Sequence, residues 1–411
     1  MLKIRLVAAA GLALLSVSAG IAPGLPVSNT TGIALAGTTR PTTGLNHEAL
    51  RSALDAVHRA GMPGVYAEVR GGGEVWRDAS GVADVRTGRP VRPGMRQRVG
   101  SITKTFTAAA VMQQVEKGRI GLDAPIGRYL PGLVPGERGN RITVRMLLNH
   151  TSGIPEYLPY AFPSLQSFPS GTSAASLDDN RFRQFSQAEL IQMGLTAPPT
   201  GEPGGTTGVY SNTNYLLLDQ LLRQVTGTTA EEYITRNVIE RAGLRHTTFP
   251  AGARIEGPHP RMYEALYGLI EPPRDYSVYN MSWVSTGAAL VSTVEDVNRF
   301  YEMLFSGKIV KRSSLAQMQR TIPVLTQDGH QTIDYGLGLQ RFTTAGCGVF
   351  WGHDGTVWGA QTVSRTSADG KRQLTVAMNL ARWNKIDSTG RPQHHPIDDA
   401  LSELYHQAMC G

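Results

Sequence analysis

The sequence has only two cysteines, Cys347 and Cys410, and no pair of cysteines separated by two residues. This scarcity argues against a structural zinc site, which usually takes four Cys or His ligands at short spacings. We expect no metal and no other cofactor. If the chain is exported, one disulfide between the two cysteines is the simplest arrangement, and two free buried thiols are the alternative.

Long apolar runs are also scarce. The only run of note is at the N-terminus, where a basic start at Lys3 and Arg5 precedes an apolar stretch and then small residues. This order is typical of a secretory signal peptide, which we expect over residues 1–36, with a linker over 37–44. A membrane anchor is the alternative, but Gly and Ser interrupt the run and its length is near the lower limit for a bilayer span. We therefore expect an exported protein, secreted or associated with the cell wall, with no stable membrane span after cleavage.

Charge is not concentrated in any part of the chain. The 40 Lys and Arg exceed the 33 Asp and Glu and give a net charge of +7, but the arginines are scattered. The apolar content of 41% is that of an ordinary soluble globular protein. A basic surface would suit an anionic partner such as a cell-wall polymer, although the scatter favours simple solubility. The sequence has no nucleic-acid motif, so we expect no nucleic-acid partner. We also expect a monomer.

The remaining chain, residues 45–411, shows a change of pattern along its length. Strand patterns occur in 45–100 and again in 283–411, whereas 101–282 is dominated by helix patterns and by loops rich in Pro, Gly and Ser. We predict an α/β fold, more strictly α+β, in which an antiparallel sheet is flanked by helices. The middle section is expected to form an inserted all-helical domain.

One serine and one lysine stand out by their spacing. Of the seven lysines, only Lys104 has a serine, Ser101, three residues before it. Residues three apart lie on the same helix face, and the surrounding helix is almost wholly apolar, which predicts burial. Burial and the positive end of the helix dipole both lower the pKa of the Lys104 ammonium, so that a neutral amine could take the Ser101 proton. The spacing alone also fits a capping serine followed by a surface lysine.

Two further motifs carry chemically useful groups. Tyr210 and Asn212 are two residues apart just before a predicted helix, so in extended backbone both side chains point the same way. The phenol could share in proton transfer and the carboxamide could hold a substrate amide. Later in the chain, His353 adds a titratable cation, and Gly355 would let an extended substrate approach a strand edge. Taken singly, each motif also fits an ordinary turn or loop.

The three motifs together resemble a known set of catalytic motifs. They are Ser101-Ile-Thr-Lys104, Tyr210-Ser-Asn212 and His353-Asp-Gly355. Their order and approximate spacing are similar to the SxxK, YxN and HxG motifs of the serine β-lactamase-like, penicillin-recognising enzymes. The sequence most resembles the exported serine D-Ala-D-Ala carboxypeptidases, relatives of class C β-lactamases. Stretches such as "ITVRMLLNHTSGI" and "GHDGTVWG" extend the resemblance over residues 45–411.

The resemblance implies a β-lactamase/transpeptidase-like fold with the active site between the helical and α/β parts. It implies that Ser101 is the acylated nucleophile, that Lys104 is its proton partner, and that Tyr210 is a general acid or base. Asn212 would contact the substrate amide. His353 would take the place of the usual lysine and support the negative end of the substrate.

The resemblance also implies the remaining parts of the site. The oxyanion hole would consist of the backbone N–H groups of Ser101 and Thr356. Thr356 and Gly355 would contact the substrate as well, and Phe162 and Trp283 stand where aromatic residues of the cleft are found.

Two residues depart from the carboxypeptidase pattern. Gln340 stands where the pattern has an arginine that holds the terminal carboxylate of the substrate, and Arg341 follows it. Asp354 stands where the family usually has Thr or Ser. If Arg341 points away from the site, recognition of a terminal carboxylate weakens, and an ester or amide without a carboxylate becomes the favoured substrate.

These observations lead us to expect a serine hydrolase that works through an acyl-enzyme on a small-molecule or peptide substrate. The first expectation is a D-Ala-D-Ala carboxypeptidase that acts on peptidoglycan peptides and is acylated by penicillins. The alternatives are a class C-like β-lactamase, a promiscuous serine esterase, and a non-catalytic protein that binds peptidoglycan or penicillin.

Overall fold

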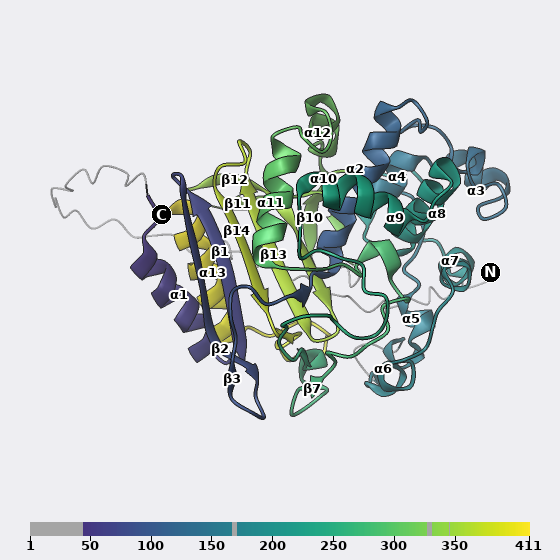
Figure 1. The fold of residues 1–411 in the computed structure, drawn as a ribbon. Helices are drawn as coiled ribbons and strands as arrows, with labels where there is room; N and C mark the ends of the chain where they lie inside the picture. The colour runs from purple at the N-terminus through teal and green to yellow at the C-terminus, as the bar shows by residue number, and fades with distance from the viewer. Residues whose placement is uncertain (1–43, 167–170, 327–330, 345) are drawn as a thin grey trace, which may run out of the picture.

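The computed structural model describes residues 44–166, 171–326, 331–344 and 346–411. The predicted signal peptide and all of the linker except Gly44 lie outside these residues, so both stay predictions. Figure 1 shows a sheet with helices on both faces, and a mainly helical part beside it. None of the helices within the described ranges has the length and apolar character that a bilayer crossing requires.

The main sheet brings together strands from both ends of the chain. Its order among the described residues is β3-β2-β1-β14-β13-β12-β11-β10-β9-β5, and only the pairing of β5 with β9 is parallel. The strands are β1 (Gly64–Gly71), β2 (Glu74–Asp84), β3 (Arg89–Pro90), β5 (Gly208–Val209), β9 (Ile322–Leu325), β10 (Thr332–Tyr335), β11 (Gln340–Thr344), β12 (Gly348–Val357), β13 (Ala360–Ser367) and β14 (Gln373–Met378). The predicted fold class, a largely antiparallel sheet flanked by helices, is confirmed.

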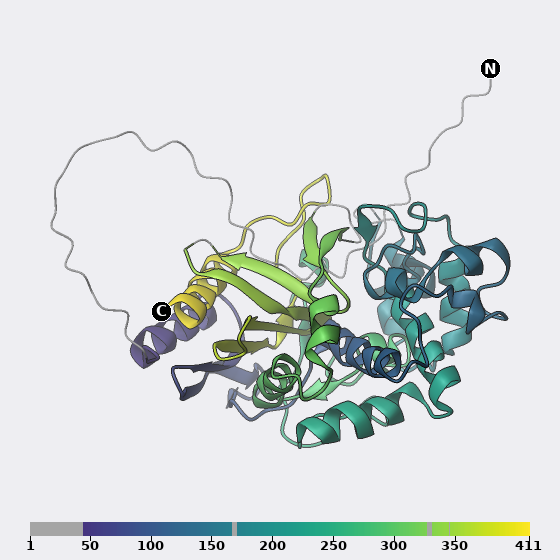
Figure 2. The same ribbon diagram turned by 90° about the horizontal axis from the view of Figure 1, so that it is seen from above.

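The first and last helices cover one face of this sheet. α1 (His47–Arg59) and α13 (Pro396–Cys410) pack together, as Figures 1 and 2 both show. α1 begins after Asn46, whose side chain accepts a hydrogen bond from the Ala49 N–H at 3.0 Å. Leucines of both helices join Leu374 of β14 in one apolar cluster, which anchors the two ends of the chain to the sheet.

The opposite face is covered by α11 (Val294–Phe305), and α2 (Thr103–Glu116) packs on α11 through the stacked rings of Phe106 and Phe300. α2 is buried from Thr103 to Gln114 and runs through the larger core, where it packs against α8 (Thr213–Thr226). The sequence predicted this burial from the apolar character of the helix. As a result, side chains in its first turn are shielded from water.

Short elements from the middle section and the chain ends complete the fold. The other helices are α3 (Gly136–Arg141), α4 (Val144–Leu148), α5 (Leu158–Ala161), α6 (Ala175–Asp179), α7 (Gln187–Thr196), α9 (Ala230–Ile234), α10 (Glu240–Ala242) and α12 (Arg312–Met318). The other strands are β4 (Gln97–Arg98), β6 (Tyr263–Glu264), β7 (Arg274–Asp275), β8 (Val291–Ser292) and β15 (Leu380–Ala381). Residues 101–282 therefore hold β5, β6 and β7 besides their helices, and the predicted domain boundaries stay a prediction.

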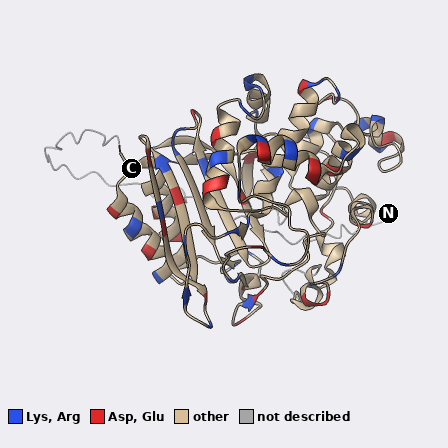
Figure 3. Ribbon diagram, viewed as in Figure 1, with Lys and Arg blue, Asp and Glu red and all other residues tan. Residues whose placement is uncertain are grey.

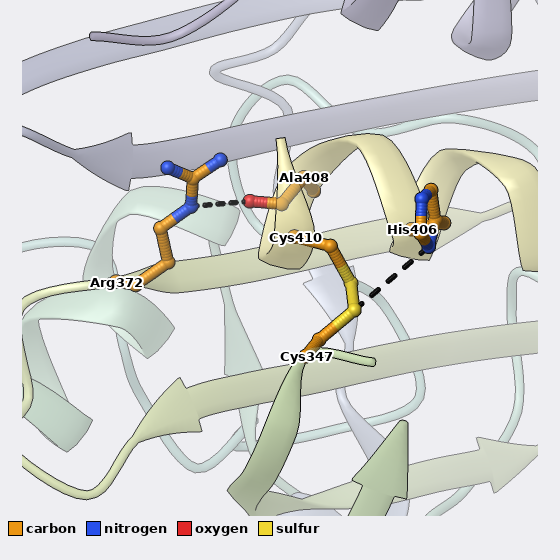
Figure 4. The surroundings of a disulfide bond; sticks show 5 residues. All are labelled: Cys347, Arg372, His406, Ala408 and Cys410. Carbon is orange, nitrogen blue, oxygen red and sulfur yellow. Dashed lines mark hydrogen bonds between the residues drawn. A yellow bond between two sulfur atoms is a disulfide. The ribbon is translucent and has the colours of Figure 1, made fainter. Parts of the chain in front are cut away.

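A disulfide joins Cys347 to Cys410, as predicted, with 5.2 Å between the two Cα atoms. It ties the connection between β11 and β12 to the last turn of α13, close to the hydrogen bond from Arg372 Nε to the Ala408 carbonyl at 2.7 Å (Figure 4). His406 Nδ1 lies 3.9 Å from Cys347 Sγ, and these three residues form the one cluster of metal-type ligands in the described part of the chain. In this structure the two sulfurs are bonded to each other.

Replacing both cysteines by serine is expected to lower the free energy of unfolding. The bridge spans 63 residues, and losing a loop closure of this size costs about 2 to 4 kcal/mol. Urea denaturation of the oxidised protein and of the double serine variant measures the difference. Reductant should destabilise the native protein and leave the variant unchanged, and equal midpoints for the oxidised protein and the variant would contradict the prediction.

Candidate active site

Ser101 and Lys104 meet where a short 3₁₀ turn, Gly100–Ile102, leads into α2. Lys104 Nζ lies 3.1 Å from Ser101 Oγ. The same amine donates to Asn212 Oδ1 at 2.6 Å and to the Gly287 carbonyl at 3.0 Å. The structure thus brings together the serine and lysine of the first motif and the asparagine of the second, and three partners fix the position of the amine.

The surroundings of Lys104 make its amine a usable base. The side chain is fully buried. Burial disfavours the ammonium form and lowers the pKa of Lys104 to about 7, although the Glu156 carboxylate acts in the opposite direction. A large fraction of the protein therefore carries an uncharged amine at neutral pH, within hydrogen-bonding distance of the Ser101 hydroxyl.

Asn212 is held by Glu156, a buried residue that the sequence reasoning did not single out. The Asn212 N–H and Nδ2 donate to Glu156 Oε2 at 2.7 and 2.9 Å, while Oδ1 faces Lys104. One of the two Nδ2 donors is therefore engaged within the protein, and the contact of Asn212 with a substrate amide stays a prediction. A signal for Glu156 was present, since it is the only charged residue in the stretch "GIPEYLP".

Tyr210 borders both the serine and the lysine. Its ring centre is 5.0 Å from Lys104 Nζ. Burial raises the pKa of the Tyr210 phenol well above its usual value, and a hydrogen bond with Ser101 lowers it only in part. The phenol therefore keeps its proton at neutral pH and is suited to donate it to a leaving group.

His353 lies on β12 and is held as a neutral ring. Its Nδ1 is 2.6 Å from the Asp354 carbonyl, and its Nε2 is 2.9 Å from the Tyr335 hydroxyl. Because a carbonyl only accepts, Nδ1 carries the proton and Nε2 accepts from Tyr335. Burial, together with the charge of Lys104, lowers the pKa of His353 to about 3. This corrects the expectation of a titratable cation here, because the buried site next to Lys104 disfavours a second positive charge.

A second histidine, His150, was not expected in the site. Its ring centre lies 4.2 Å from that of Tyr210 and 4.7 Å from that of Tyr335. Its Nδ1 accepts from the Ser211 N–H and from the Asn214 side chain, each at 3.2 Å, and burial lowers its pKa well below the usual value. The φ of 62° at His150 is costly for a residue with a Cβ and persists only where the surroundings hold it. A neutral imidazole thus supports the phenol that borders Ser101.

Two glycines allow the backbone next to Ser101 to approach β12. Gly100 has φ 57°, and a Cβ there would lie 2.6 Å from the Thr356 nitrogen. A Cβ on Gly355 would lie 2.9 Å from the Ser101 nitrogen. Such distances are too short for any real side chain, so both positions require glycine. The backbone N–H groups of Ser101 and Thr356 are therefore neighbours, which is the arrangement that the predicted oxyanion hole needs.

Three residues predicted to contact the substrate, Phe162, Trp283 and Arg341, are engaged elsewhere in the protein. Phe162 and Trp283 are fully buried, with 5.7 Å between their ring centroids, and Trp283 packs on Trp358 at 5.3 Å. Both rings belong to the core and present no surface to a ligand. Arg341 on β11 is 38% exposed and forms an ion pair with Asp334 at 3.2 Å. Within the described ranges it has no hydrogen bond or ion pair with Ser101, Lys104, Tyr210 or His353.

The two residues that depart from the carboxypeptidase pattern are both engaged within the protein. Asp354 forms a buried ion pair with Arg365, with one contact at 3.1 Å, and Gln340 Oε1 accepts from the Asp354 N–H at 3.1 Å. The Arg365 guanidinium lies over the Phe342 ring and 5.7 Å from the ring of Tyr405 on α13. The Asp354 charge is therefore neutralised on the α13 side of the sheet.

Comparison with known proteins assigns the family. The sequence profile described as Beta-lactamase matches residues 50–397, most of the chain. The protein belongs to this family and is a serine hydrolase of the β-lactamase and penicillin-binding type, which confirms the resemblance noted in the motifs.

Its relatives include several hydrolases. Penicillin-binding protein 4* of Bacillus subtilis is 25% identical over 328 residues, which cover 77% of this chain and 68% of that protein. A D-aminopeptidase of Cereibacter sphaeroides is 26% identical over 82% of this chain, but the match spans only 60% of that relative's length. The solved structure of a D-stereospecific amidohydrolase from Streptomyces sp. is 30% identical, with a TM-score of 0.74, and the match covers 89% of this chain and 99% of that one.

The state of Lys104 predicts a pH profile for acylation. The amine acts as a base only when uncharged, so kcat/KM should rise as the pH increases through about 7 and then level off. Glu156→Gln removes a carboxylate that raises the pKa of Lys104, so the rise should move to lower pH. Rates measured across pH test this, with Glu202→Gln, an exposed acid, as the control that keeps the native profile. An unchanged profile in Glu156→Gln would contradict the assignment.

Proposed function

We propose that the protein is a serine amidohydrolase that forms an acyl-enzyme at Ser101. Its substrates are D-configured aminoacyl or peptidyl amides whose leaving amine needs no carboxylate. The main support is the 3.1 Å contact between Ser101 Oγ and the buried amine of Lys104, whose pKa is lowered to about 7. The names of the Streptomyces amidohydrolase and the D-aminopeptidase support amide chemistry and D configuration.

In the first half-reaction, Lys104 accepts the Ser101 proton while Oγ bonds to the substrate carbonyl carbon. Negative charge develops on the carbonyl oxygen, which faces the N–H groups of Ser101 and Thr356. The C–N bond then breaks, and the Tyr210 phenol gives its proton to the departing amine. Lys104 returns the proton it took to Tyr210, so an acyl ester and a free amine remain.

In the second half-reaction, water attacks the ester carbonyl and loses its proton to the uncharged amine of Lys104. The Ser101 oxygen leaves and regains a proton, and the free acid is released. The neutral rings of His353 and His150 hold their places without adding a charge, which keeps the amine of Lys104 basic enough for both steps.

The charges near the site favour a leaving group without a carboxylate. The two arginines on the strands beside His353 are already paired, Arg341 with Asp334 and Arg365 with Asp354. His353 is neutral, because its pKa is lowered to about 3. A substrate carboxylate at Ser101 would therefore find no unpaired arginine on these described strands, because Arg365 lies on the α13 side of the sheet and Arg341 is paired with Asp334.

The second candidate is the D-Ala-D-Ala carboxypeptidase expected from the motifs, which the similarity to penicillin-binding protein 4* favours. β-Lactamase and esterase activities would share the acylation step and differ in how fast the acyl-enzyme is hydrolysed. We also propose that the protein acts after export, which the leader pattern supports.

Labelling with a fluorescent penicillin tests the acylation site. The native protein should form a covalent adduct, Ser101→Ala should form none, and Lys104→Ala should slow labelling by about 100-fold or more while the fold persists, because general-base catalysis is lost. Circular dichroism checks the fold of each variant. Labelling of Ser101→Ala at the native rate would refute this site.

A matched substrate pair tests the leaving group. We expect an N-acyl-D-Ala-D-Ala peptide and its C-terminal amide to be hydrolysed with kcat/KM values within about threefold of each other, because neither arginine is free to discriminate. The corresponding L,L peptides should react much more slowly. A kcat/KM at least about tenfold higher for the acid than for the amide would instead favour the carboxypeptidase.

A further inference from the structure

One hollow of the molecule shares no lining residue with the group around Ser101. It has a volume of about 430 Å³ and lies between β3 and the loop that leads into β6. Its charged and titratable lining residues are Asp84, Arg89, Arg254, His259 and Arg261. Three guanidinium groups therefore face a single carboxylate across one cavity, and Figure 3 shows the basic strand β3 at one end of the sheet.

Two of these arginines are fixed by contacts with the protein. Arg89 Nη2 donates to the His259 carbonyl at 2.9 Å. Arg261 contacts Asp275 at 3.2 Å and Asp84 at 3.8 Å. These contacts hold the basic side chains in place before any ligand arrives.

Arg254 is different, because it is exposed and has neither a hydrogen bond nor an ion pair within the described residues. Its donors are therefore available to a ligand in the hollow. Five N–H groups in a planar fork are a good match for an oxyanion.

A buried arginine adds charge beneath the same loop. Arg98 is 1% exposed, and its Nη2 donates to the carbonyls of Ala253 at 2.8 Å and Tyr279 at 3.1 Å. Its Nε and Nη1 have no partner among the residues described. Burial lowers the pKa of Arg98 to about 10, so it stays charged at neutral pH, and burial and the charges of Arg89, Arg261 and Arg98 lower the pKa of His259. The positive charges of Arg89, Arg261 and Arg98 therefore all reach His259, which lines the hollow.

We propose that this hollow, the arginine pocket (Arg89, Arg254, Arg261 and His259), binds a phosphate-bearing ligand. Guanidinium groups bind phosphate through paired N–H donors, and a phosphate has enough terminal oxygens to engage more than one fork at once. The volume lies within the range of small-molecule sites. The phosphate would belong either to a free phosphate compound or to an anionic polymer of the cell surface.

Titration calorimetry at low ionic strength tests the proposal, with pyrophosphate as the free compound and poly(glycerol phosphate) as the polymer. In the Arg89→Ala/Arg254→Ala variant, the Kd of the better probe should rise at least about tenfold, since charge-assisted hydrogen bonds are lost. Arg223→Ala, an exposed arginine on α8, should keep the native Kd. Hydrolysis by all variants should stay native. Tighter binding of the polymer would identify the polymer as the source, and binding of pyrophosphate alone would identify the free compound.

Three outcomes would overturn the proposal. These are no binding of either phosphate probe to the native protein, equal weakening in Arg223→Ala, and binding of citrate as tight as that of pyrophosphate, which would show no preference for phosphate. Should the double variant unfold, Arg254→Ala alone repeats the test, because that side chain supports no other residue of the described structure.

Discussion

The buried amine of Lys104 sets the main constraint on this molecule. An ammonium group without water is costly, and among the described residues its hydrogen-bond partners are hydroxyl, carboxamide and carbonyl oxygens at 2.6 to 3.1 Å. Glu156 adds a carboxylate to this network, because it is hydrogen-bonded to Asn212, which in turn accepts from Lys104. The resulting balance leaves the amine poised between its two protonation states, and the packing around α2 serves to maintain that balance.

The site also depends on backbone segments that approach more closely than side chains allow. Ser101 lies on a turn that packs against β12, and the glycines at 100 and 355 remove the two Cβ atoms that would separate them. Within the described residues, the pairing of β11 with β12 ends at Gly352, and the residues of β12 that follow His353 pair with β13. On the other side of this segment the turn that carries Ser101 packs against β12, which places the serine beside the strand of His353.

The sequence was most informative where the chemistry is local. Helix geometry brings Ser101 and Lys104 together at a spacing of three, and strand-like stretches in 45–100 and 283–411 predicted the antiparallel sheet. Glu156 and Tyr335 were missed because their roles arise only when distant segments meet, 56 residues apart for the bond to Asn212 and 18 for the bond to His353. The charge of His353 was misjudged for a related reason, since its burial is a property of the folded molecule. Two-residue strands such as β5 carry too little pattern to be predicted.

The buried ion pair between Asp354 and Arg365 couples the two positions energetically. Losing either Asp354 or Arg365 alone would leave a buried charge without its counterpart, at a cost of about 3 to 5 kcal/mol. A change at one of the two residues alone is therefore expected to destabilise the sheet around His353. Replacing both together by apolar side chains of similar volume is expected to cost far less than either single change.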